Sequence, residues 1–296
     1  MASSSHRWQK TERDDEILAA LDLCPLEYRD LLALSETFSR PFGSLDRVRR
    51  TLKRLEAAGQ VRSWRYATTS ASGGASPLYY KLTPEGYRTL HGDDDAVPPT
   101  KRYLQETSPG RHQHQQFLTQ FTVKTHVAAH RLGLPIVESF PENTYKMETQ
   151  HGPIFPDRRF TLVIPPVTSL TYCIELDNST ETIVSRKSTD TIEMKICRYL
   201  ADLRSCDYSY RVLFVVTGAK QRMQNILSVI RENEPFVDFH PFYVVQLEHF
   251  LRSENPFFDP IFAHPRNARI ALLRSHAESI FSIEPPKAPL VRPLGV

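Results

Sequence analysis

The first sixty residues carry three segments in which apolar positions recur at helical spacing. These segments predict helices over residues 14–23, 26–38 and 44–55. In the third segment the apolar residues fall on one face, and Ser44 occupies the N-cap position. Three short amphipathic helices are therefore expected at the start of the chain.

Two runs rich in Val, Trp, Tyr and Leu follow these helices. They cover residues 61–68 and 78–82, and the stretch 70–77 between them is rich in Ser and Gly. Gly59 ends the third helix shortly before the first run. The pattern predicts two strands joined by a flexible loop, which is a β-hairpin or wing.

Beyond residue 110, helical patterns alternate with strand patterns. A helix begins near Arg111, and an extended stretch covers residues 145–163. Further strands are predicted over residues 136–140, 170–177, 212–217 and 242–245, and further helices over residues 182–203 and 221–233. The expected order is helix, three strands, helix, strand, helix. The fold class predicted from the whole pattern is α+β.

The amino-acid composition limits the classes of protein to which the chain can belong. The chain has 296 residues, of which 40% are hydrophobic and 24% charged, which excludes fibrous and wholly disordered classes. No apolar run approaches the length of a membrane helix, and no apolar signal segment follows Met1, so we expect a cytoplasmic protein with no membrane partner. The four cysteines never form a C-x-x-C pair, which argues against a structural zinc site.

The net charge of +3 is unevenly distributed. Residues 1–92 carry 14 Lys and Arg against 11 Asp and Glu, and the remainder carries 23 of each. Residues 44–66 are the most basic stretch, and we predict that their cations bind DNA: Arg47, Arg49, Arg50, Lys53, Arg54, Arg62 and Arg65. Guanidinium groups on a helix can contact phosphates or guanine edges in the major groove.

The helices and the basic hairpin together resemble a winged helix-turn-helix DNA-binding domain. We assign this domain to residues 1–91, with a linker over residues 92–110 that is acidic and then proline-bearing. The resemblance implies double-stranded DNA as the partner, and a homodimer is compatible with it, since winged-helix proteins often dimerise to read paired half-sites. Two alternatives remain: a solvated helix face, or a surface that docks another protein.

Carboxylates mark a second candidate site. Asp157 follows Phe155-Pro156, and Glu175 and Asp177 end a strongly apolar strand. Glu175 and Asp177 are two residues apart, so both side chains leave the same face of the strand. Oxygen ligands of this kind suit Mg²⁺ or Mn²⁺, and a metal held there could polarise a phosphate and activate water. We therefore predict that Glu175 and Asp177 form part of a metal site.

The second half of the chain resembles a known fold. The predicted element order and the residues Pro156-Asp157 and Glu175-Leu176-Asp177 resemble the PD-(D/E)xK restriction-endonuclease-like core, which we assign to residues 111–250. This resemblance implies that Asp157 joins Glu175 and Asp177 as a metal ligand. More specifically, residues 112–222 resemble the plasmid replication-relaxation family. The matching positions are His112 or His114, Glu138, Asp157, Glu175, Asp177, Thr180-Glu181, Lys195, Tyr199, the strand 212–217 and Arg222. The resemblance implies a DNA-processing or plasmid-maintenance role.

One departure from this pattern affects the predicted chemistry. Nucleases of this class carry lysine two residues after the second acid, where this sequence has Asp177. Lys195 on the following helix could replace it, with Tyr199 one turn further along, and we include both as catalytic candidates. Two functions follow: metal-dependent DNA cleavage or nicking, or non-catalytic regulation of transcription or replication with a degenerate nuclease domain. Residues 251–296 are taken as a C-terminal extension, partly disordered.

Overall fold

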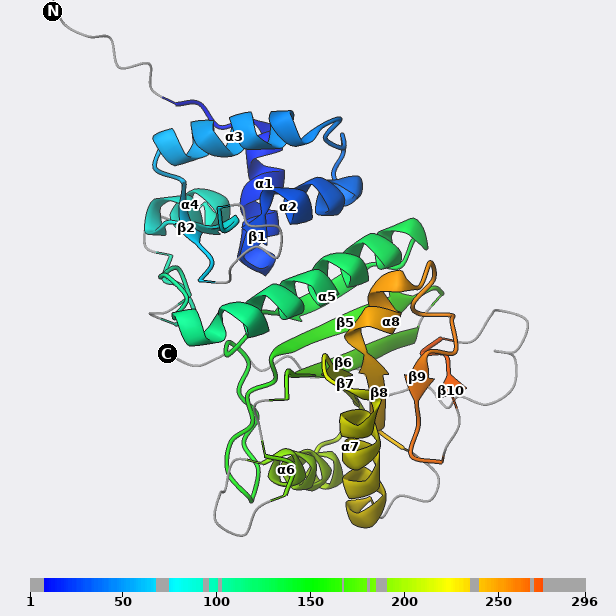
Figure 1. Ribbon diagram of the computed structural model, residues 1–296. Coiled ribbons are helices and arrows are strands. Elements are labelled where there is room, and N and C mark those ends of the chain that lie inside the picture. Colours follow the sequence, from blue (N-terminus) through cyan, green and yellow to red (C-terminus); the bar gives the residue numbers. More distant parts are fainter. Residues whose placement is uncertain are drawn as a thin grey trace, which may run out of the picture. The chain divides into compact units, whose positions relative to one another are not determined.

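The structure is a computed structural model of a mixed α and β protein (Figure 1). It describes residues 8–67, 75–92, 96–100, 103–166, 168–179, 182–184, 191–234, 240–266 and 269–273. The chain divides into two compact units, residues 1–127 and 128–296, and the boundary falls within one helix. Each unit is described by itself.

The first unit contains the helices and the hairpin expected near the N-terminus. Its elements are α1 (Glu12–Leu23), β1 (Leu26–Glu27), α2 (Tyr28–Leu34), η1 (Ser35–Thr37), α3 (Leu45–Ala57), β2 (Val61–Arg65), β3 (Leu78–Leu82), α4 (Pro84–His91), η2 (Pro109–Arg111) and the start of α5 (His112–Arg131). The strands form an antiparallel sheet in the order β1-β3-β2. The predicted loop 70–77 lies mostly outside the described residues.

A compact apolar core holds the first unit together. Helix α3 contributes Val48, Leu52 and Leu55, which are fully buried and pack with apolar residues of α1, α2 and the hairpin. The Ser44 hydroxyl accepts a hydrogen bond from the Arg47 amide and so caps this helix, as predicted. The opposite face of α3 is left exposed.

The second unit is built on a seven-stranded sheet. The strands are β4 (Ile136–Phe140), β5 (Arg158–Ile164), β6 (Thr168–Asp177), β7 (Arg211–Val216), β8 (Phe242–Gln246), β9 (Phe262–Ala263) and β10 (Arg269–Ile270), in the order β10-β9-β8-β7-β6-β5-β4. Strands β6, β7 and β8 are parallel, and the other neighbours are antiparallel. The parallel connections run through α6 (Ile192–Ser205) and α7 (Lys220–Asn233), and α8 (Leu247–Arg252) follows β8.

Helices α6 and α7 cover one face of this sheet. Their buried residues, among them Ile196 and Ile226, pack against Cys173 of β6 and Phe214 of β7. Because side chains alternate along a strand, Glu175 and Asp177 share the face of Cys173 and also point toward the helices. The sheet and these two helices therefore determine the surroundings of both acids.

The structure corrects two predicted helices. Residues 182–184 are not helical, and α6 begins at Ile192 because the Thr191 hydroxyl caps it by accepting from the Met194 amide. Residues 185–190 lie outside the described residues. The helix predicted over 26–38 is shorter than expected, because Leu26 and Glu27 pair with β3 and the last turn is a 3-10 helix.

The segment predicted as a linker is partly fixed on the first unit. We call residues 103–107 the strap. The Lys81 ammonium donates to the Gln105 carbonyl at 2.8 Å, and the Thr107 amide donates to the Tyr79 hydroxyl at 3.0 Å. These bonds attach the strap to β3, so this part of the predicted linker has a defined position.

Residues after 250 include strands that belong to the sheet. β9 pairs with β8, and β10 pairs with β9, so the predicted C-terminal extension contributes to the second unit as far as Leu273. The proline-bearing tail, residues 284–296, lies outside the described residues. Within the described part of the chain, no helix combines the length and apolar character required to span a membrane.

Candidate functional site

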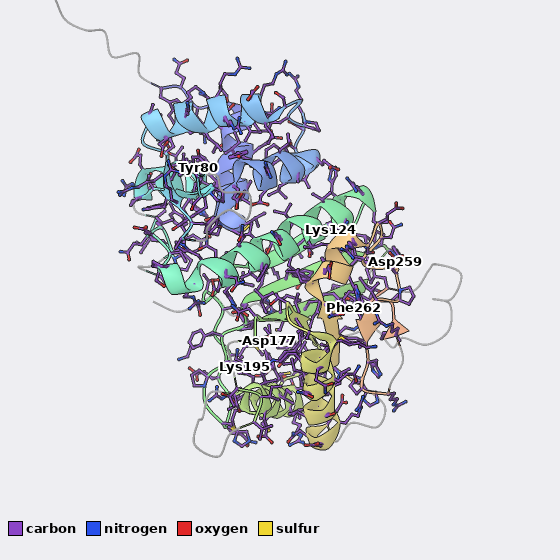
Figure 2. The ribbon with its side chains drawn as sticks, viewed as in Figure 1. Tyr80, Lys124, Asp177, Lys195, Asp259 and Phe262 are labelled. Carbon is purple, nitrogen blue, oxygen red and sulfur yellow. The ribbon has the colours of Figure 1, made fainter. Side chains whose placement is uncertain are left out.

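The candidate acids gather at the carboxyl ends of the parallel strands. Asp177 ends β6 beside Val216 of β7, which in turn lies beside Gln246 at the end of β8. Figure 2 labels Asp177 and Lys195 in this part of the second unit. β5 is antiparallel to β6, so the residue that precedes its start, Asp157, reaches the same end. In open sheets with parallel strands, ligands commonly bind outside this edge.

Glu175 is almost completely enclosed. Its side chain is 3% exposed, Lys195 Nζ lies 3.0 Å from Oε2, and the Tyr199 hydroxyl donates to Oε1 at 2.5 Å. Burial raises the pKa of Glu175 to about 7, and the nearby charge of Asp157 adds to the rise, while Lys195 and Tyr199 oppose it. The carboxyl group is thus poised to exchange a proton near neutral pH.

Lys195 and Tyr199 reach Glu175 because they lie four residues apart on α6. This spacing puts both side chains on one face of the helix, one turn apart. Tyr199 is fully buried, and burial and the neighbouring Glu175 raise its pKa well above the ordinary value. A buried hydroxyl that keeps its proton is a poor nucleophile, so we interpret Tyr199 as the group that positions Glu175.

Asp177 faces a different cation. Arg222, from the first turn of α7, donates from Nε to Oδ2 at 2.8 Å and from Nη2 to Oδ1 at 2.7 Å. This bidentate pair uses both carboxylate oxygens of a side chain that is 1% exposed. The turn that follows β6 and the turn that follows β7 also lie close together, because a Cβ added at Gly218 would lie 2.3 Å from the Ser179 hydroxyl oxygen.

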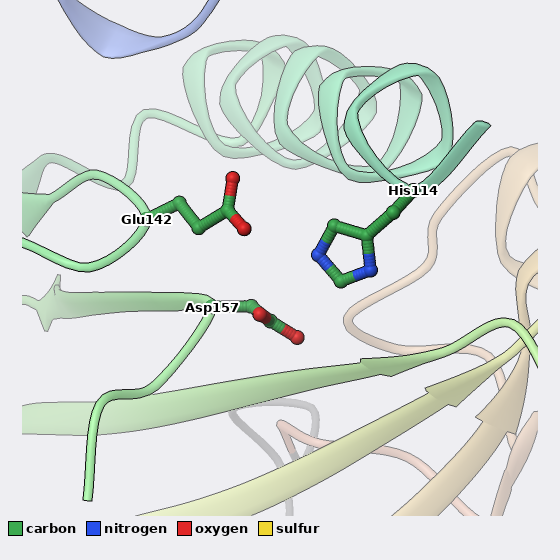
Figure 3. Close-up of side chains that lie close together, drawn as sticks. All are labelled: His114, Glu142 and Asp157. Carbon is green, nitrogen blue, oxygen red and sulfur yellow. The ribbon is translucent and has the colours of Figure 1, made fainter. Parts of the chain in front are cut away.

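Asp157 lies against the backbone of β6. Its Oδ2 accepts a hydrogen bond of 2.7 Å from the Leu176 amide. Glu142, in the loop after β4, brings a carboxylate oxygen within 4.8 Å of one from Asp157 (Figure 3). His114, which Figure 3 also labels, is a residue of the first unit.

The predicted metal ligands differ in how well they fit a divalent cation. Asp157 and Glu142 offer hard oxygen donors that are close together, which suits Mg²⁺ or Mn²⁺. The three predicted ligands do not meet this condition, because no choice of one carboxylate oxygen from each of Asp157, Glu175 and Asp177 puts all three oxygens within 4.8 Å of one another. Glu175 instead contacts Lys195 and Tyr199, and Asp177 contacts Arg222. The oxygen donors that fit a cation best are therefore those of Asp157 and Glu142.

Two other positions from the sequence have structural partners. Glu138 accepts from the Thr161 hydroxyl at 2.9 Å and lies 3.9 Å from Arg159, so it is tied to β5. His112 is buried; its Nδ1 accepts from the Ala67 amide at 2.7 Å, and its Nε2 lies 2.8 Å from the Thr107 carbonyl oxygen. His112 thus joins the hairpin to the strap and the start of α5.

The predicted DNA-binding cations form an exposed surface on the first unit. All seven residues are exposed: Arg47, Arg49, Arg50, Lys53 and Arg54 on α3, and Arg62 and Arg65 on β2. Arg54 nevertheless forms an ion pair with Asp14 of α1, which is fully buried. The guanidinium of Arg49 stacks 4.5 Å from the Tyr28 ring centroid. Arg54 therefore has a structural partner as well as an exposed position.

Sequence reasoning missed Arg222, Glu142 and Asp14 as partners of the predicted residues. Arg222 was noted only as a matching family position, and its pairing with Asp177 joins residues 45 apart in the chain. No local pattern marks Glu142, because its nearness to Asp157 follows from the antiparallel pairing of β4 and β5. Asp14 could have been noticed as an acid in an otherwise apolar helical stripe.

The chain is a two-unit protein with an exposed basic surface in one unit and buried acids at a sheet edge in the other. A family model described as replication-relaxation matches residues 32–211, which is more than half of the chain. The chain therefore belongs to the replication-relaxation family, as its motifs predicted, and membership indicates a role in plasmid replication or relaxation. No curated protein and no solved structure matches it.

Proposed function

We propose that this protein binds double-stranded DNA through α3 and the β2–β3 hairpin and cleaves or nicks DNA in the second unit. The observation that carries the proposal is the 3.0 Å contact between Lys195 Nζ and Glu175. It supports the idea that Lys195 takes the place of the lysine absent from position 177. Membership of the replication-relaxation family is consistent with DNA as the substrate.

In the proposed chemistry, a water molecule attacks the scissile phosphorus and Glu175 accepts its proton. The bond from phosphorus to the leaving oxygen breaks, and that oxygen takes a proton from solvent. The Glu175 pKa of about 7 suits the role of proton acceptor, since general bases work best with a pKa near the operating pH. Tyr199 holds Glu175 in place, and the ammonium group of Lys195 stabilises the negative charge that develops on the phosphate. Asp157 and Glu142 are the proposed ligands of Mg²⁺ or Mn²⁺. When bound, such an ion would polarise the scissile phosphate.

The test is a nicking assay on supercoiled plasmid with Mg²⁺. We expect the wild-type chain to produce open circles and Lys195→Met and Glu175→Ala to lose about 100-fold or more in rate, the scale of a lost charge-stabilising or acid-base group. Glu232→Gln on α7 is the control, because Glu232 is exposed. Equal nicking by the wild type and both site variants would refute the assignment.

A second candidate function is non-catalytic regulation of replication or transcription. The observation that favours it is the bidentate pair between Asp177 and Arg222, which engages an acid that a nuclease would direct at its metal. On this reading the second unit is a scaffold, and DNA binding by the first unit needs no cation. Specific DNA binding that survives Glu175→Ala and chelation, with no nicking under any metal, would select this function.

DNA binding itself is tested through α3. Arg47→Ala and Arg50→Ala remove exposed cations for which the structure gives no carboxylate partner closer than 4.0 Å among the described residues. Each is expected to weaken binding to duplex DNA in a mobility-shift assay, without changing thermal unfolding. Retained affinity in the double variant would move the DNA-binding surface elsewhere.

A further inference from the structure

A groove lies on the hairpin face that points away from the core of the first unit. Val61 of β2 is buried in that core. Because side chains alternate along a strand, Arg62 and Trp64 both project from the opposite face of β2. With Leu82 at the end of β3, Pro84 at the start of α4, Pro98 before the strap and Leu104 within it, they line a cavity of about 430 Å³. The groove lies wholly within the first unit.

The walls of the groove are fixed by hydrogen bonds. The Lys81 ammonium binds the Gln105 carbonyl, and the Tyr79 hydroxyl accepts from the Thr107 amide, so the strap is held at a set distance from β3. The Thr83 hydroxyl accepts from the Gly86 amide and fixes the start of α4. The groove is therefore part of the folded unit.

The groove presents an aromatic plane next to a cation. The Trp64 ring stacks on Tyr79 with centroids 5.8 Å apart and planes at 22°, and the Arg62 guanidinium lies 5.3 Å from the Trp64 ring centroid. Arg62 is exposed and continues the basic surface of α3. Aromatic rings beside arginine form the platforms on which unpaired bases stack, while the cation attracts the backbone phosphate.

We propose that this groove binds an unpaired nucleobase of single-stranded or locally melted DNA, next to duplex held by α3. The inference rests on the proposed function, in that it takes DNA as the ligand of the first unit. A paired base is covered on both faces by its neighbours and cannot enter a concave groove, so the occupant is unpaired. Glu106 also lines the groove, but the exposed cations of Arg62 and α3 outnumber this single carboxylate and favour a polyanion over a neutral chain.

The experiment uses the intrinsic fluorescence of Trp64. The chain has two tryptophans, so Trp8→Phe leaves Trp64 as the only tryptophan, whose emission is excited selectively at wavelengths that tyrosine does not absorb. In this background, a single-stranded oligothymidylate should quench the emission, whereas blunt duplex should bind with little quenching. Trp64→Leu should weaken single-strand binding on the order of ten-fold or more, the loss expected for one base-aromatic stack, and this loss should clearly exceed any loss of duplex affinity caused by the change in the hairpin. Trp64→Phe keeps an aromatic ring and should recover most of the loss.

The possible outcomes separate this inference from the function on which it rests. Normal duplex binding with single-strand affinity unaffected by Trp64→Leu would overturn the groove proposal alone. Failure of the wild type to bind either DNA would overturn both. Quenching by a proline-rich peptide of residues 284–296, with none by DNA, would identify a peptide-docking groove and refute the nucleobase. Thermal unfolding of each variant checks that the unit remains folded.

Discussion

At the scale of single residues, Glu175 makes the stability of the protein depend on pH. Burial raises its pKa from an ordinary 4.5 to about 7, so between these values the folded chain keeps a proton that the unfolded chain releases. The contribution of this group to the free energy of unfolding should therefore fall as pH rises from about 4.5 to about 7 and then level off. Denaturant unfolding at a series of pH values measures this slope.

Glu175→Gln should flatten that part of the profile, because glutamine does not titrate. Glu232→Gln, an exposed position on α7, provides the comparison and should keep the wild-type slope. If the wild-type and Glu175→Gln profiles coincide between pH 4.5 and 7, the assigned pKa of Glu175 is wrong.

Arg54 and Arg50 are neighbours on α3 with different partners. Arg54 pairs with the fully buried Asp14, so Arg54→Ala leaves a buried carboxylate without its cation and should destabilise the first unit by roughly 1–3 kcal/mol. Arg50→Ala should leave its stability unchanged. Urea unfolding followed by tryptophan emission reports this unit, because Trp8 and Trp64 both belong to it. Equal destabilisation by both variants would contradict the role given to Asp14.

The candidate residues differ in how far the sequence could predict their partners. The sequence suggested Lys195 as a replacement for the missing lysine, but it left open whether this side chain reaches the acids; in the structure Lys195 Nζ lies 3.0 Å from Glu175. The pairing of Asp177 with Arg222 was not anticipated, since it depends on how β6 and β7 lie side by side. A sequence shows which residues carry charge, but the choice among several cations is made by tertiary packing.

At the scale of elements, periodicity predicted most helices and strands but not their exact ends. Residues 182–184, which were expected to start a helix, are not helical, and α6 starts at Ile192, where the Thr191 hydroxyl provides a cap. The strap was read as part of a linker because proline and acidic residues precede it. Its hydrogen bonds to β3 are tertiary and leave no periodic signal.

Gly86 shows how closely α4 approaches the turn between α3 and β2. A Cβ at this position would lie 1.9 Å from the Gln60 carbonyl oxygen, which is backbone and cannot rotate away. Gly86→Ala should therefore displace α4 and destabilise the first unit by about 1–3 kcal/mol. Thermal unfolding of this variant is compared with that of Gly110→Ala, where a Cβ meets nothing within 4 Å. Similar stability of the two variants would mean that α4 can shift without cost.

At the scale of the whole molecule, the small net charge of +3 conceals an unequal division of charge between regions of the chain. The exposed cations of α3 and β2 lie in one unit, and cations that bind phosphates release counterions from DNA. The logarithm of the affinity for duplex DNA should thus fall steeply with the logarithm of the salt concentration. Fluorescence anisotropy at several salt concentrations gives the slope.

Replacing Arg47, Arg50 and Lys53 by alanine should make that slope shallower by about 0.9 for each lost phosphate contact. The matched control removes the same charge from exposed positions of the second unit, namely Lys146, Arg204 and Arg252. If net charge alone governed binding, the two triple variants would lose affinity equally and show the same slope. If α3 contacts the phosphates, only the first variant changes the slope, because counterions are released where the contacts form and not in proportion to the total charge.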